Sequence, residues 1–203
     1  MKRIILFLVV TLLVPVAAKA KVSDPVWRAI INAYRPAVWS EQLESAYSDP
    51  DPANFRSFVV VMVTDMAAER ADRFISWGNY DYRAVKIDAS TGKVKNRRGK
   101  VYTFLQPGDV MAVVGLNKLG DTVSIKLMSP DVYIPLNREK DKKFSRVTDT
   151  VKIKLPKDIA ESDDPSQALS MMAQFIKPFP NMQSAQRFSP SVRRTTSATI
   201  ATE

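Results

Sequence analysis

The clearest pattern in the chain is an alternation of polar and apolar side chains near its middle. Residues 122–127 read TVSIKL, which is the period-two pattern of a strand with one buried and one wet face. The preceding run at 110–116 is almost wholly apolar, so we expect that strand to be covered on both sides. Turn sequences rich in glycine, proline and aspartate stand at 106–109 and 117–121. The pattern predicts a compact unit of three strands over 100–128.

Three other segments on either side of this unit have strand character. Residues 58–64, FVVVMVT, are large and mostly β-branched, which favours a central strand. Residues 82–87 place Val85 and Ile87 on one face. Residues 132–136 are bounded by prolines and predict an edge strand or an extended loop.

A last strand is predicted at 151–155, where valine, isoleucine and leucine alternate with lysine. Extended back to Arg146, this strand would put Asp149 on its buried face. We therefore expect a bulge or a break near Thr148.

Helices are predicted before and after the strands. The segment 23–47 reads as two helices, with Asp24-Pro25 as the first cap and a break at Pro36. Residues 66–74 have a helix-forming composition and predict an excursion or a single helix between strands. The final helix begins at Asp164-Pro165 and has one apolar side, formed by Leu169, Met172, Ala173 and Ile176.

These elements predict a mainly β fold with helical flanks, an α+β protein built on a small antiparallel barrel. The succession of a Pro-Gly-Asp turn, an apolar strand, a Gly-Asp turn and an alternating strand resembles the bacterial SH3-like domains over about residues 82–155. An OB-like barrel gives nearly the same pattern and is the alternative. The expected organisation is a signal peptide at 1–20, a helical segment at 21–52, a barrel domain with a closing C-terminal helix at 53–178, and a disordered tail at 179–203, which is rich in Ser, Thr, Arg and Ala.

The N-terminus has the features of an export signal. Lys2 and Arg3 precede an apolar run over 4–16, and Ala18-Lys19-Ala20 closes the run with small residues. The run is shorter than the ~20 residues that a spanning helix needs, so cleavage before Lys21 is favoured over a retained anchor. We therefore expect a periplasmic or secreted protein. The chain has no cysteine, which excludes disulfides and a lipid-bearing cysteine.

The charge balance narrows the choice of partners. Removing residues 1–20 takes away three of the 30 basic residues and none of the 21 acidic ones, which leaves a net charge of +6. Outside the cytoplasm this charge favours phospholipid headgroups, lipopolysaccharide, anionic glycans or acidic proteins, and nucleic acid is not expected there. A peripheral contact with a membrane is compatible with the same charge. The plain alternative is that the charge only keeps the protein soluble.

The composition leaves little room for catalysis. Histidine and cysteine are both absent, which excludes imidazole acid/base chemistry, thiol nucleophiles and thiolate metal sites. The Ser-x-x-Lys match at 90–93 contains a glycine and lies between two predicted strands, so we interpret it as a turn. We predict no catalytic residue, no metal ligand and no cofactor, although five aspartates are candidates for a carboxylate pair: Asp65, Asp81, Asp88, Asp109 and Asp121.

Two basic clusters, at 93–100 and 138–146, are the stronger functional signal. Arginine and lysine in such clusters bind phosphate or carboxylate groups, although charged loops are more often only solvated. The predicted function is an exported, non-enzymatic binding or accessory module that engages an envelope protein or an anionic glycan or lipid headgroup. The alternatives are an enzyme acting on envelope polymers through paired carboxylates and a subunit that docks through a strand or its tail. The predicted binding residues are Arg97, Arg98, Lys100, Lys142 and Lys143 for charged contacts, and Trp77 and Tyr80 for stacking.

Overall fold

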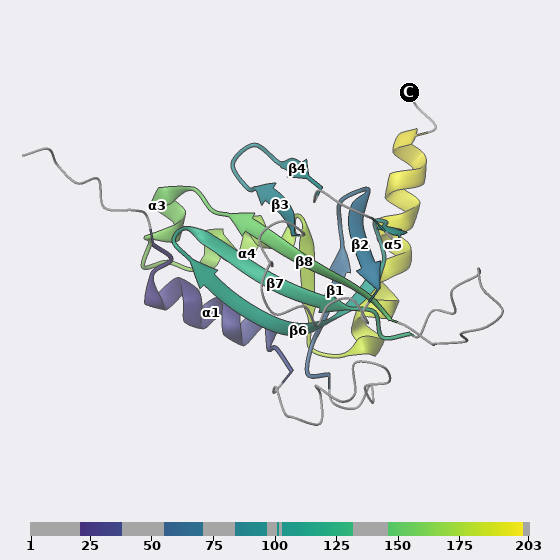
Figure 1. Ribbon diagram of the computed structural model, residues 1–203, viewed down its shortest axis with the longest axis horizontal. Coiled ribbons are helices and arrows are strands. Elements are labelled where there is room, and N and C mark those ends of the chain that lie inside the picture. The colour runs from purple at the N-terminus through teal and green to yellow at the C-terminus, as the bar shows by residue number, and fades with distance from the viewer. Residues whose placement is uncertain are drawn as a thin grey trace, which may run out of the picture.

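The protein folds as a curved mixed β-sheet with helices packed against both of its faces (Figure 1). The computed structural model describes residues 21–37, 55–70, 84–96, 101, 103–131 and 146–200, with the side chains of 69, 70 and 193–200 left aside. The elements in chain order are α1 (Asp24–Tyr34), β1 (Phe58–Val61), β2 (Met66–Arg70), β3 (Val85–Asp88), β4 (Lys93–Lys95), β5 (Thr103–Leu105), β6 (Val110–Leu119), β7 (Thr122–Met128), β8 (Val147–Lys154), α3 (Lys157–Ala160), α4 (Ser166–Ala173), β9 (Ile176–Phe179) and α5 (Met182–Ile200).

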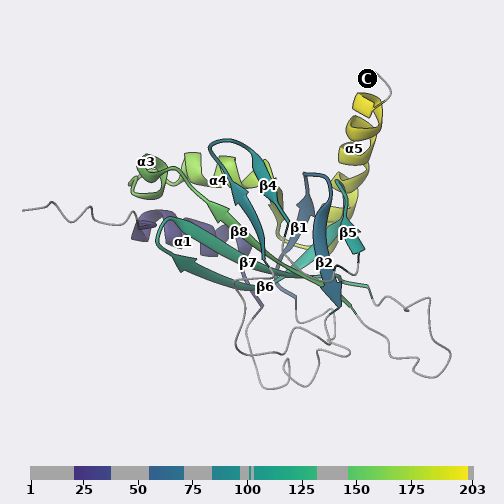
Figure 2. The same cartoon turned by 45° about the horizontal axis from the view of Figure 1, so that its top comes forward.

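The strand order explains why the sheet curls. The main path runs β4-β3-β8-β7-β6-β1-β9. β7 pairs with β8 along its whole length, while the other edge of β8 is shared by β3 in parallel and by β2 in antiparallel orientation. β5 extends the β2 branch, and Asn96 Oδ1 after β4 accepts a hydrogen bond from the Ala67 amide of β2 at 3.1 Å. The two branches thus meet beyond β8 and give a half-barrel (Figure 2).

The mainly β, α+β prediction is therefore confirmed, but the sheet is mixed and not antiparallel throughout as predicted, because β3 pairs with β8 in parallel. The predicted glycine turns are confirmed as well, because Gly108 and Gly120 have φ of +92° and +61° and precede β6 and β7. The alternating segment forms β7, with Val123, Ile125 and Leu127 fully buried. β5 differs from expectation, since it pairs with β2 and not with β6.

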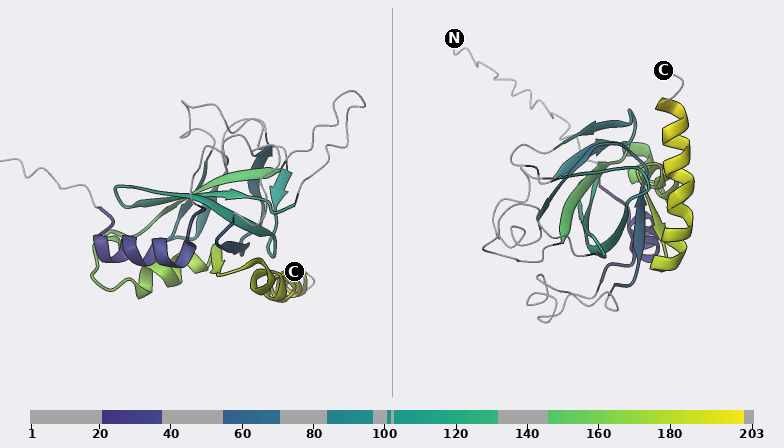
Figure 3. Two further views of the ribbon diagram at one scale, coloured as in Figure 1. Left: turned by 90° about the horizontal axis from the view of Figure 1, so that it is seen from below. Right: turned by 90° about the vertical axis from the view of Figure 1, so that its right-hand side faces the viewer.

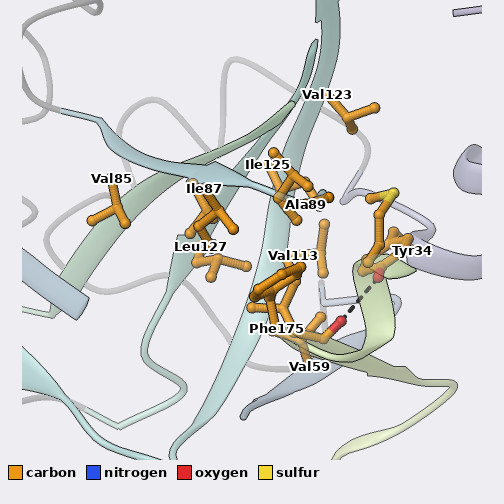
Figure 4. Packing of buried hydrophobic residues seen from close by; sticks show 14 of the residues in the cluster. Tyr34, Val59, Val85, Ile87, Ala89, Val113, Val123, Ile125, Leu127 and Phe175 are labelled. Atoms are coloured by element: carbon orange, nitrogen blue, oxygen red, sulfur yellow. Dashed lines mark hydrogen bonds between the residues drawn. The ribbon is translucent and has the colours of Figure 1, made fainter. Parts of the chain in front are cut away.

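Alternate residues of the central strands build two separate cores. Val59 and Val113 belong to the larger core, which α1 and α4 cover from one side (Figures 3 and 4). Val60 and Val114, their neighbours in sequence, belong to a smaller core that α5 covers with Ala185 and Val192. Because successive residues of a strand point to opposite faces, α5 lies on the outer face of β1 and β6.

Four sequence predictions about elements are wrong in the described residues. Met66–Arg70 forms strand β2 and not a helix, because its small side chains Ala67 and Ala68 are fully buried in the larger core. The last predicted helix ends at Ala173, and Ile176 instead begins β9 beside β1. The tail predicted to be disordered forms helix α5 over Met182–Ile200. β8 runs from Val147 without a break, so Asp149 is buried on the face that carries Val147 and Val151.

The first helix is confirmed with a small shift at its start. Its N-cap is Ser23, whose side chain accepts a hydrogen bond from the Val26 amide at 3.3 Å, and Asp24 occupies the first turn. The signal peptide, the second predicted helix at 38–47 and the proline-bounded strand at 132–136 lie outside the described residues. No helix in the described part of the chain is long and apolar enough to cross a membrane.

Tyr34 joins α1 to the edge strand β9. Its ring is fully buried, and its hydroxyl donates a hydrogen bond to the Ile176 carbonyl at 2.9 Å (Figure 4). Burial raises the pKa of this hydroxyl above its ordinary value of 10.0. The folded protein therefore keeps a proton that the unfolded chain releases at alkaline pH.

Replacing Tyr34 with phenylalanine tests this contact in two ways. The variant should lose about 1–2 kcal/mol of unfolding free energy near neutral pH, because the Ile176 carbonyl loses a buried donor. The wild-type stability should be complete below pH 10 and then fall by up to about 1.4 kcal/mol per pH unit, and Tyr34→Phe should remove that part of the fall. Urea unfolding at several pH values measures both effects, and an alkaline slope unchanged in the variant would contradict them.

The packing of α5 can be tested at Ala185, which is fully buried against the outer face. Ala185→Glu forces a charge into that contact and should cost about 3 kcal/mol or release the helix. Gln183→Glu places the same charge at an exposed position of the same helix and is the matched control. Urea unfolding together with trypsin cleavage at Arg187 measures the outcome, and equal behaviour of the two variants would show that α5 does not pack as described.

Candidate functional site

The residues predicted from the two basic clusters cannot be placed in the fold. Arg97, Arg98, Lys100, Lys142, Lys143, Trp77 and Tyr80 all lie outside the described residues. Arg146, the last member of the second cluster, is described and does not suit a ligand contact. It is 2% exposed, and its Nη1 donates hydrogen bonds to the Ser129 and Pro130 carbonyls. The strongest basic feature that the structure describes lies elsewhere, on the outer face of the sheet.

Six lysines gather on the part of that outer face that α5 leaves uncovered. They come from four strands, and the strand registers place them on one side. We call this surface the lysine face, defined by Lys86, Lys93, Lys95, Lys126, Lys152 and Lys154.

Two neighbouring cross-strand rows of this face differ in charge. In one row Asp88 lies between Lys93 and Lys154. Hydrogen bonds from Ser90 hold the pKa of Asp88 below its ordinary value, so at neutral pH a carboxylate separates the two ammonium groups. This arrangement is the ordinary way to place lysines side by side on a sheet.

In the second row the central position is also a lysine. Lys86 of β3 is in register with Lys95 of β4 on one side and with Lys152 of β8 on the other. Like charges directly opposite one another on adjacent strands destabilise a sheet, by a few tenths to about 1 kcal/mol for each pair. Within the described residues, neither Lys86 nor Lys95 has an ion pair. The fold thus places a third positive charge, that of Lys86, at the centre of this row. The neighbouring row has the carboxylate of Asp88 at the equivalent position.

The lysine face is hollowed. A depression of about 810 Å³ lies over β3, β4, β6, β7 and β8, and Asp88 is its single acidic lining residue in the described part of the chain. Thr122, Ser124 and Thr150 contribute hydroxyl groups to its lining. Leu119, which is 75% exposed, lies at its border. A concave, cationic and hydroxyl-lined surface suits an anionic ligand that also carries hydrogen-bonding groups.

Lys126 is less exposed than Lys86, Lys93, Lys95 and Lys154, and it lies beside a bulge in β6. The register with β7 shifts between Val113 and Gly115, which brings Gly115 opposite Lys126. A Cβ atom at Gly115 would lie 3.2 Å from Lys126 Cδ, so the aliphatic part of the lysine rests on the glycine. Desolvation by this burial lowers the pKa of the Lys126 ammonium. The bulge therefore holds one half-buried cation in the floor of the hollow.

The aspartates proposed for catalysis serve local structure. Asp88 Oδ1 accepts hydrogen bonds from the Ser90 amide and hydroxyl, and Asp109 Oδ2 accepts from the Gln106 amide at 2.8 Å. Asp65 accepts from the Gln106 side chain, and Asp121 accepts from Thr122. These contacts support the turn interpretation of Ser90 and Asp88. Asp81 lies outside the described residues.

A second hollow, of about 340 Å³, lies where α5 meets β6. Two carboxylates, Asp109 and Asp131, are among its lining residues, and this is the arrangement closest to the predicted carboxylate pair. The described residues contain no group of three or more His, Cys, Asp or Glu side chains able to hold a metal ion.

The comparisons with known proteins assign no function to this chain, so its function has to be inferred from the surfaces described above. The chain matches no family model, no curated protein and no solved structure.

The sequence predicted only part of the lysine face, namely the lysine-bearing outer face of the strand at 151–155. A second signal was present at 86, 93, 95 and 126, where lysines also occupy alternate strand positions.

Replacing Lys86 tests whether its row is strained by charge. Lys86→Glu would turn two repulsive neighbours into attractive ones, so we expect the unfolding free energy to rise by about 0.5–1 kcal/mol. Lys157→Glu, at an exposed position of α3, changes the net charge equally and is the control. Urea unfolding at low salt should show the gain for Lys86→Glu alone, and the gain should shrink as salt is added. A loss of stability in Lys86→Glu would contradict the described register.

Proposed function

We propose that the protein is a non-enzymatic binding module of the cell envelope that holds an anionic glycan or lipid headgroup on its lysine face. The observation that carries the proposal is the row Lys95, Lys86 and Lys152, three lysines in register across three strands. A row that costs stability is retained where the charge has a use. Export of the chain, expected from residues 1–20, would bring this face to phosphate- and carboxylate-rich polymers and lipids.

The shape of the surface supports binding over simple solubility. Lysines that only keep a protein soluble are dispersed and alternate with acidic residues, whereas these six surround one depression to which the described residues contribute a single carboxylate, that of Asp88. Neighbouring strands lie about 4.8 Å apart, so the row presents three charges within about 10 Å. A ligand with several anionic groups would therefore contact more than one lysine at once. Arg97, Arg98 and Lys100 follow β4 in the chain, lie outside the described residues and stay predicted binding residues.

We also propose that the sheet is a small barrel of the SH3-like kind. A curled sheet that forms a half-barrel is consistent with an SH3-like barrel, with an OB-like barrel as the alternative. Barrels of both kinds bind ligands on a sheet face or in the loops beside it. A binding role on the outer face of β3, β7 and β8 agrees with either assignment.

Reversing the charged row tests the proposal. The triple variant K86E/K95E/K152E replaces one like-charge row by another, so its stability should stay close to that of the wild type. Its affinity for vesicles containing phosphatidylglycerol, or for a sulfated or uronate oligosaccharide, should fall at least about a hundredfold, because each lysine near an anionic surface contributes about 1 kcal/mol. Isothermal calorimetry or cosedimentation at low and high salt measures the loss.

The matched control carries the same change in net charge elsewhere. Arg28, Lys157 and Arg187 are exposed residues of α1, α3 and α5, and none of them lines the hollow. R28E/K157E/R187E should keep most of the affinity. Equal losses in the two triple variants would show a dependence on net charge alone. If the wild-type protein bound none of the anionic probes, the proposal would be wrong. The hollow lined by Asp109 and Asp131 would then be the next candidate site.

A further inference from the structure

The first residues that the structure describes are built into the fold. Val22 is fully buried in the larger core, and its amide donates a hydrogen bond to the Gly120 carbonyl at 2.9 Å. The Ser23 amide donates a hydrogen bond to the Ala160 carbonyl at 2.8 Å. The expected cleavage of the export signal lies directly before Lys21. Lys21 is exposed and is therefore the single residue between the bond to be cut and the buried Val22.

Two side chains strengthen this start of the chain, which we call the N-terminal latch and define by Val22, Ser23 and Asp24. Ser23 Oγ donates a hydrogen bond to the Ser162 carbonyl at 2.7 Å, across 139 residues of sequence. Lys118 Nζ, near the end of β6, donates to the Val22 carbonyl at 3.3 Å and to Asp24 Oδ1 at 3.2 Å. The latch thus joins α1 to the β6–β7 hairpin and to the chain after α3, at one end of the sheet (Figure 1).

A closed latch is a poor substrate for a peptidase. Proteases bind the residues on both sides of the cut bond as an extended segment, and they cut a folded protein where a segment has opened. The residues just after this bond would have to leave the core at Val22. They would also have to give up the backbone hydrogen bonds of Val22 and Ser23. The fold therefore keeps the expected cleavage site out of reach, although Lys21 itself is exposed.

The latch can close only late in the production of the chain. Ser162 follows Ser23 by 139 residues, which at about 5–20 residues per second is an interval of roughly 7–30 s. During that interval the partners of the latch at 160 and 162 have not yet been made. The residues after the cleavage site are then open to a peptidase, because the surface that will bind them does not exist.

We propose that the N-terminal latch sets the order of maturation, so that cleavage before Lys21 has to take place before the protein folds. A chain that folds first keeps residues 1–20, because the latch then protects the bond. This inference goes beyond the proposed function. It depends on the expected export signal and uses none of the six lysines of the lysine face.

The experiment follows cleavage of the full-length chain by purified signal peptidase in detergent micelles. Folded wild type should be cut at least about thirtyfold more slowly than a variant with Gly-Ser-Gly-Ser-Gly-Ser inserted between Lys21 and Val22. The insertion keeps the sequence around the bond and moves it away from the latch. The factor is that expected for opening a segment that buries a valine and two backbone hydrogen bonds. Mass spectrometry of the product identifies the bond that is cut.

The matched control places the same insertion between Ser90 and Thr91, which are exposed residues of the turn before β4. This variant lengthens the chain equally but leaves the latch closed, so it should be cut as slowly as the wild type. Equal rates for the folded wild type and the insertion after Lys21 would show that the latch does not restrict cleavage, and the inference would be wrong.

A single substitution weakens the latch without lengthening the chain. Lys118→Gln removes the ammonium group that bonds Val22 and Asp24, and it should speed the cleavage of the folded chain about three- to tenfold. Lys157→Gln removes the same charge from an exposed position of α3 and should change the rate by about twofold or less. Thermal unfolding checks the fold of each variant, and the two insertions still decide the question if Lys118→Gln does not fold.

Wild-type chain diluted from urea directly into the peptidase supplies a second measurement. Cleavage should be rapid while the chain is still folding, and the uncut remainder should then become resistant. If this unfolded chain were not cut either, residues 1–20 would not be a cleavable signal, and the inference would fail. That failure is distinguishable from a failure of the proposed function, because anion binding by the lysine face is measured separately with the row reversal.

Discussion

The pairing of β7 with β8 is the contact on which the rest of the structure depends. β8 is paired on both edges, and its second edge holds the two branches that carry β3 with β4 and β2 with β5. The inner side of these two strands carries much of the larger core, and their outer side carries Lys126, Lys152 and Lys154. Each of these two strands has to pack against the core on one face and to meet solvent on the other. Its alternation of apolar and basic residues is the direct result.

The elements that the sequence predicted well are those fixed by nearby residues. The alternation in β7 and the glycines before β6 and β7 need only local geometry, and both are confirmed. The failures involve distant partners. Ala67 and Ala68 favour a helix by composition, but the branch beyond β8 needs small buried side chains there. Ile176 continues an apolar helical side in the sequence, yet it is needed beside β1 to extend the sheet.

The candidate site was hidden for the same physical reason. Lys86, Lys95 and Lys152 are each ordinary surface lysines in sequence, and only the register across three strands places them side by side. At Asp149 the sequence pattern did suggest a structural feature, but that feature does not form. The charge of Asp149 predicted a bulge or a break in β8, but the unbroken pairing with β7 keeps the strand continuous, and the carboxylate is buried. Non-local pairing therefore decides both the core of the sheet and the chemistry of its outer surface.

The parallel pairing of β3 with β8 also fixes when the lysine face comes into being. Some sixty residues separate the two strands in the chain, so a long loop must close before they meet. Until β8 has been made and has paired, Lys86, Lys93 and Lys95 are on a free hairpin and Lys126 has no Thr150 opposite it. An unfinished chain, or one shortened before β8, would consequently carry the lysines without assembling the surface.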